Sequence, residues 1–155
     1  MIDLNEKDIG VFVAAVERYF HQITATAPML RSAWLSTADE PLPSHEYTGL
    51  IEVSGDFSGN VYFSTGRATI EHLLVAMREP IRDESNLLDA VGEIANTLAG
   101  NAREYFGERL VISVPTTLRG PAPALQQRAC SHPYVIAIQW QRHEAVLVVN
   151  LGRRN

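Results

Sequence analysis

The segment 86–106 constrains the fold most, because its apolar residues recur at the 3.6-residue period of an α-helix. Gly107 follows the segment, and glycine commonly ends a helix. The residues predicted to form one wide apolar face are Leu87, Val91, Ile94, Ala95, Leu98, Ala102 and Tyr105. We therefore expect a long helix that buries this face against the rest of the protein.

The opposite face of this helix carries a narrow row of polar and small residues. At 100° per residue, Asp89, Glu93, Asn96 and Gly100 fall within about 60° of one another. Like charges four residues apart cost a few tenths of a kcal/mol, and glycine inside a helix costs about 1 kcal/mol relative to alanine. Residues that do not favour stability suggest a docking surface. A surface helix also has polar residues on its outer face, so spacing alone names no partner.

The rest of the chain combines a second long helix with several hairpin-forming strands. Helical spacing predicts a helix over 6–24, with helix-start residues between Asn5 and Asp8, and a short helix over 69–77. Alternating residues predict strands over 29–36, 47–54, 60–65, 110–114, 134–141 and 144–151, with a glycine-rich turn over 55–59. The segment 119–131 contains two prolines and a glycine and is expected to be a mobile loop. Because helices and hairpins form separate runs, the pattern favours an α+β fold.

The composition is that of one globular domain spanning residues 1–155. Of the 155 residues, 46% are hydrophobic, which suffices for a core without disulfides. No apolar run approaches the roughly 18 residues that a membrane helix needs, and the acidic start lacks the basic region of a signal peptide. The single cysteine, Cys130, fits a reducing compartment, so we expect a cytoplasmic protein with no membrane partner.

The charge pattern argues against nucleic acid and nucleotide phosphates as ligands. The 13 Lys and Arg residues against 18 Asp and Glu give a net charge of −5, and the arginines are scattered. Lys7 is the only lysine, and it does not stand in the Gly-Lys-Ser/Thr motif of a phosphate-binding loop. An acidic surface instead favours a partner with a basic or mixed face.

Other side chains give weaker signals. Cys130 lies near His132 in a segment rich in proline and alanine, which argues against a nucleophilic cysteine. Trp34 and Trp140 lie in predicted strands, where a core or interface position is expected. No two of the five histidines have the i, i+4 spacing of a helical metal site, so we expect no metal; they are His21, His45, His72, His132 and His143.

Residues 89–102 read Asp-Ala-Val-Gly-Glu-Ile-Ala-Asn-Thr-Leu-Ala-Gly-Asn-Ala. This segment resembles the motif helix of the CheC/CheX family of chemotaxis phosphatases, in which Asp/Ser-x-x-x-Glu-x-x-Asn is followed four residues later by glycine. Residues 49–61 are similar to the family's sheet hairpin, and 112–116 to the strand and Pro-Thr after the motif helix, so the similarity covers roughly residues 47–120. The first helix has Glu-Arg-Tyr-Phe at 17–20 and no Glu-x-x-Asn. The chain thus resembles CheX, with one motif helix, more than CheC, with two.

The resemblance implies an α+β fold in which two long helices pack on one face of an antiparallel or mixed sheet, and a homodimer. It implies a phosphatase that hydrolyses the aspartyl phosphate of a CheY-type response regulator. Asn96 would orient the attacking water and Glu93 would bind a lysine of the regulator. Asp89 and Gly100 would contribute to docking. No cofactor of its own is implied, since Mg²⁺ would belong to the regulator's acidic site.

Two other interpretations remain open at the level of sequence. In the first, the chain is a non-catalytic CheX-like module that binds a response regulator or another signalling protein. In the second, it is a structural dimerisation domain, for which the polar face of the helix would be irrelevant. The presence of both Glu93 and Asn96 favours catalysis, because a module without activity could readily lose the amide.

Overall fold

The computed structural model describes residues 2–24, 28–80 and 83–155, and these form an antiparallel sheet with helices on one face. The strands are β1 (Ile2–Asp3), β2 (Met29–Leu35), β3 (Tyr47–Gly55), β4 (Phe57–Thr65), β5 (Leu110–Ile112), β6 (Thr116–Arg119), β7 (Tyr134–Trp140) and β8 (His143–Arg153). Along the sheet the order is β2-β7-β8-β4-β3-β5, while β1 pairs with β8 and β6 with β3. The α+β expectation is confirmed, and every strand pairing in the described ranges is antiparallel rather than mixed.

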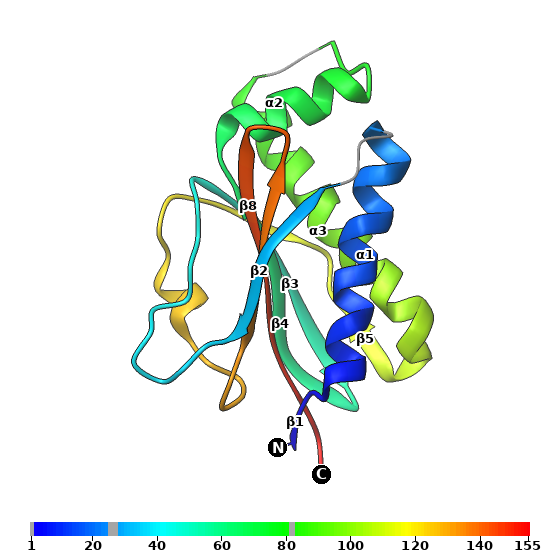
Figure 1. The fold of residues 1–155 in the computed structure, drawn as a ribbon, viewed down its shortest axis with the longest axis vertical. Helices are drawn as coiled ribbons and strands as arrows, with labels where there is room; N and C mark the ends of the chain where they lie inside the picture. The colour runs from blue at the N-terminus through cyan, green and yellow to red at the C-terminus, as the bar shows by residue number, and fades with distance from the viewer. Residues whose placement is uncertain (1, 25–27, 81–82) are drawn as a thin grey trace.

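The two long helices, α1 (Glu6–Thr24) and α3 (Glu84–Phe106), cover the same face of the sheet, as predicted (Figure 1). The shorter α2 (Arg67–Ala76) lies at one end of them. Both long helices turn their apolar residues toward the sheet, and Phe12, Phe20, Leu87 and Leu98 have no exposed surface. These side chains join those of β3, β4 and β8 in the main core.

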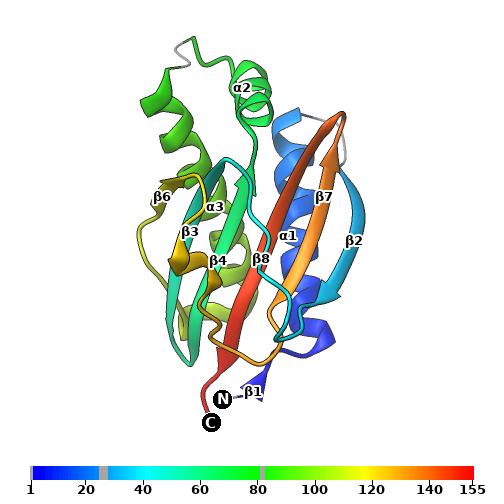
Figure 2. The same ribbon diagram turned by 90° about the vertical axis from the view of Figure 1, so that its left-hand side faces the viewer.

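A second, smaller core lies on the other face of the sheet, beneath two loops (Figure 2). It contains Leu42, Leu50, Tyr62, Leu125, Val135, Val146 and Val148. The 3₁₀ turn η2 (Pro123–Gln126) supplies Leu125, and the side chain of Gln126 bonds both the N–H and the carbonyl of Leu42. The expectation of a mobile loop over 119–131 is therefore wrong for this part, which is packed and hydrogen-bonded.

The start of α1 has the reciprocal hydrogen bonds that its sequence predicts. The Asp8 N–H donates to the Asn5 side chain at 2.8 Å, and the Asn5 N–H donates to the Asp8 carboxylate at 3.1 Å. Arg153 of β8 also reaches the Asp8 carboxylate at 2.8 Å. The beginning of the first helix is thereby tied to the end of the last strand.

Several boundaries and one core assignment differ from the sequence prediction. α2 spans Arg67–Ala76 rather than 69–77, and the β3–β4 turn is shorter than 55–59 because the strands continue to Gly55 and from Phe57. The short β1 and β6 are not predicted at all. Tyr105, placed on the buried face of the long helix, is 51% exposed, because its ring lies at the surface between α3 and α1, with the Lys7 ammonium 6.0 Å from the ring centre.

Candidate functional site: the outer face of α3

Two glycines let α3 lie directly on the sheet. A Cβ at Gly49 of β3 would overlap the Val91 carbonyl, and a Cβ at Gly92 would stand 2.8 Å from a methyl carbon of Thr117 on β6. Helix α3 therefore contacts the backbone of β3 at Gly49 and the side chain of Thr117 on β6 at Gly92. These two contacts fix the rotation of the helix about its own axis. Its outer face is set by these contacts.

The first turn of α3 is stabilised by an N-cap hydrogen bond and by an ion pair. The Asn86 N–H donates to the carboxylate of Asp83, the N-cap residue, at 2.9 Å. The hydroxyl of Tyr47 donates to Glu84 at 2.7 Å, and Arg119 lies 3.1 Å from the same carboxylate. The N-terminal end of α3 is thus fixed to β3 and β6 by these contacts.

The four residues singled out from the sequence share the outer face of α3 but differ in exposure. Asp89 and Glu93 are exposed, whereas Asn96 and Gly100 are half-buried. A Cβ at Gly100 would meet no atom within 4 Å outside the local helix backbone. The space over Gly100 is therefore open, and an approaching backbone could come close to the helix there.

The polar groups of this face are unengaged within the described part of the chain. The only hydrogen bond there that involves Glu93 uses its backbone carbonyl, which accepts from the Thr97 hydroxyl at 2.9 Å. Among the described residues, no partner bonds the Asn96 amide or pairs with the carboxylates of Asp89 and Glu93. A carboxylate and an amide one turn apart are consequently both free to contact another molecule.

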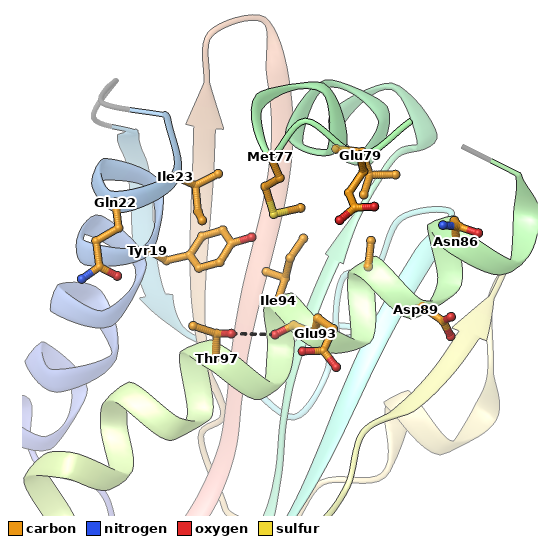
Figure 3. Close-up of a pocket in the computed structure, with 12 residues that line it drawn as sticks. Tyr19, Gln22, Ile23, Met77, Glu79, Asn86, Asp89, Glu93, Ile94 and Thr97 are labelled. Carbon is orange, nitrogen blue, oxygen red and sulfur yellow. Dashed lines mark hydrogen bonds between the residues drawn. The ribbon is translucent and has the colours of Figure 1, made fainter. Parts of the chain in front are cut away.

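A groove of about 370 Å³ lies next to this face, between α1, α2 and α3 (Figure 3). Ile23, Met77 and Ile94 are among its apolar lining residues, and Asp89 and Glu93 stand at its edge. Asn96 and Gly100 do not line it. The structure thus brings the two carboxylates to the groove and leaves the amide and the glycine on the helix surface beyond it.

The phenol of Tyr19 reaches into this groove from α1, with its hydroxyl lying between Met77 and Ile94 (Figure 3). Tyr19 is 5% exposed. Burial, with a contribution from the charge of Glu93, raises the pKa of Tyr19 to about 12, so its hydroxyl stays protonated at neutral pH. Sequence periodicity identifies Tyr19 only as a core position, and nothing in the pattern marks its hydroxyl.

A pair of histidines lies elsewhere, where the sequence shows no pairing signal. His72 of α2 and His143 of β8 are 3.0 Å apart between ring nitrogens, and both rings pack on Trp140. Burial, and secondly the charge of His72, lower the pKa of His143. Trp140 is buried, as expected, whereas Trp34 is 36% exposed on β2. Residues 71 apart in sequence meet here through tertiary structure alone.

Cys130 and His132 are the remaining side chains that were considered in the sequence. Burial raises the pKa of Cys130 to about 11, which makes its thiol a poor nucleophile, and His132 is exposed as predicted. In the described ranges, no three or more His, Cys, Asp or Glu side chains converge to hold a metal ion. None of the described helices is both long and apolar enough to span a membrane.

Comparison with known proteins places this geometry in a family. The fold is similar to the chemotaxis protein CheX from Vibrio vulnificus, with a TM-score of 0.79 and 16% identity over 94% of this chain and 99% of that one. It is also similar to CheX from Desulfovibrio desulfuricans, with a TM-score of 0.75 and 16% identity over 96% and 99% of the two chains.

A third similar structure is the CheX–CheY–BeF₃–Mg²⁺ complex from Borrelia burgdorferi, with a TM-score of 0.71 and 11% identity over 94% and 97% of the two chains. A sequence comparison with curated proteins gives no significant match. The family model "Chemotaxis phosphatase CheX" matches residues 47–139, which is more than half of the chain and includes β3, β4, the whole of α3 and β6. The protein therefore belongs to the CheX family of chemotaxis phosphatases.

Proposed function

We propose that the protein hydrolyses the aspartyl phosphate of a CheY-type response regulator, with the outer face of α3 as its docking and catalytic surface. The observation that carries the proposal is the pair formed by Glu93 and Asn96, one turn apart, with side chains that have no partner among the described residues. Family membership and the CheY found with a structurally similar CheX support the same partner class.

The chemistry of the reaction suits an amide at position 96. Hydrolysis of an acyl phosphate requires water in line with the phosphorus, and positioning rather than covalent chemistry dominates such reactions. An amide can hydrogen-bond water without carrying a negative charge that would repel the phosphoryl oxygens. Asn96 is thus assigned to orient the water, with a contribution of several kcal/mol from holding it in place.

The other residues of this face are assigned to binding. Glu93 binds a lysine of the regulator and so places Asn96 over the phosphate. Asp89 contacts the edge of the docked regulator, and Gly100 leaves room for its backbone. Mg²⁺ is carried by the regulator, because the reacting carboxyl phosphate lies in the regulator's own acidic site.

We further propose that the whole chain acts as one domain in the cytoplasm and as a homodimer. Strand β2 ends the sheet and pairs only with β7 among the described strands. Trp34 and Leu35 on this strand are 36% and 51% exposed. An open edge with exposed apolar side chains suits pairing with a second copy.

The test is the rate of phosphate loss from a phosphorylated CheY-type regulator of the same organism, with the wild type and with Asn96→Ala. The wild type is expected to accelerate the loss, and the variant to be slower by about 100-fold or more. Asn96 is half-buried and makes no bond to a described residue, so the melting temperature should change little. If both proteins bind the regulator but neither accelerates the loss, the chain is a non-catalytic binding module.

A further inference from the structure

The groove beside α3 has three properties that together define what can occupy it. Its walls are apolar, with Met77 and Ile94 facing each other across it (Figure 3). Its edge carries the carboxylates of Glu79, Asp89 and Glu93, and none of its described lining residues is basic.

The hydroxyl of Tyr19 opens into this groove and has no partner among the described residues. The residue is 5% exposed, yet its hydroxyl forms no hydrogen bond with any residue in the described ranges. Because the hydroxyl opens into the groove, water can bond it until a polar group of another molecule takes that place. A tyrosine hydroxyl is protonated at neutral pH, so it can donate a hydrogen bond and also accept one.

Glu79 is a second polar residue of this groove that can contact another molecule. It is exposed just beyond α2, its backbone N–H bonds the Leu74 carbonyl, and no described residue pairs with its carboxylate. In Figure 3 the Tyr19 hydroxyl and the Glu79 carboxylate both lie near the end of the Met77 side chain, one on either side of it. An apolar channel that holds a carboxylate and an unpartnered hydroxyl is complementary to an aliphatic stem with a cationic head.

We propose that this groove is a second docking site for the response regulator, and that it receives one lysine or arginine side chain from the regulator's surface. The stem lies between Met77 and Ile94, and the head group contacts Glu79 and the Tyr19 hydroxyl. This contact is separate from the lysine assigned to Glu93 above. It rests on the proposed function, and it means that the regulator is held at two acidic positions, of which only one is on α3.

The experiment measures the dissociation constant of the regulator activated with beryllofluoride, together with turnover at saturating phosphorylated regulator. Glu79→Lys is expected to weaken binding by about tenfold or more, because reversing an exposed charge lowers the association rate. Tyr19→Phe is expected to weaken binding by about two- to fivefold, because losing one hydrogen bond shortens the lifetime of the complex. Turnover at saturation should stay at the wild-type value in both variants. Glu17→Lys is the matched control, because it makes the same charge change at an exposed position on α1 that does not line the groove.

The outcomes distinguish failure of the second docking site from failure of the proposed catalytic role. If Glu79→Lys binds as tightly as Glu17→Lys, the groove receives no cationic side chain and the second docking site is refuted. If Glu79→Lys loses binding while Asn96→Ala keeps wild-type turnover, the groove is supported and the proposed catalytic role fails instead. If the wild type does not bind the activated regulator at all, both proposals are refuted.

Discussion

Replacing Gly100 by alanine should stabilise the protein and weaken its function at the same time. Gly100 lies inside α3, six residues before the helix ends, and an added Cβ would meet no atom within 4 Å. The full difference in helix propensity is therefore gained, about 1 kcal/mol in the free energy of unfolding. For a chain of this size that corresponds to a rise of roughly 2–4 °C in melting temperature.

The same methyl group should impair docking if Gly100 provides clearance for the regulator. It fills the space over the outer face of α3, so the regulator must shift outward or distort. Because the role proposed for Asn96 depends on its position, a small displacement should reduce the dephosphorylation rate by at least about tenfold. Thermal unfolding and phosphate release on the same samples measure both effects.

Gly10→Ala provides a matched control for this prediction. Gly10 lies inside α1, and an added Cβ there also meets nothing within 4 Å, so the gain in stability should be similar. Because Gly10 lies on α1 and not on the outer face of α3, the substitution should leave the dephosphorylation rate unchanged. If Gly100→Ala is stabilised and remains as active as Gly10→Ala, the clearance role is wrong. If it is not stabilised, the open environment deduced for position 100 is wrong.

Three further changes test other parts of the structure. Glu93→Ala should raise the regulator concentration needed for half-maximal rate, with the rate recovering at saturation; a variant that saturation cannot rescue would contradict the anchoring role. Because burial lowers the pKa of His143, the neutral ring is favoured in the folded state, so stability should be complete above about pH 6.5 and fall as the pH is lowered. Denaturant unfolding at about pH 7.5 and pH 5 measures this loss, which should be smaller in His143→Gln; an equal loss would mean that other groups control it. Asp8→Ala should lose roughly 2–3 kcal/mol of unfolding free energy, because it removes a cap and leaves Arg153 without its carboxylate; a loss below about 0.5 kcal/mol would contradict this.

Helix α3 and its outer face could be predicted because their determinants are local. Apolar residues at helical spacing give the buried side, and the same rotation places Asp89 next to Glu93 on the other. The outer position of Glu93 and the open space at Gly100 follow from this periodicity. Tyr105 is the exception, since periodicity does not show that its side chain lies at the surface between α3 and α1.

Features built from distant segments could not be predicted in this way. β6 is four residues long, contains little apolar sequence, and exists because it pairs with β3. The packing of Gly49 against Val91 and of His72 against His143 likewise joins separate elements. The groove needs three helices to meet, so neither Tyr19 nor Glu79 carries a local signal of the role proposed for it.

The position of β8 in the sheet has a consequence for synthesis. β8 pairs with β1, β4 and β7 and is therefore the strand that joins the two halves of the sheet, although it is the last of the described strands in chain order. Until it leaves the ribosome, β4 and β7 have exposed edges and the apolar face of α1 has no complete surface to cover. The nascent chain must remain unfolded or be protected by a chaperone until then, since exposed strand edges promote aggregation. The sheet should consequently form only after β8 has been translated, however early the segments before it leave the ribosome.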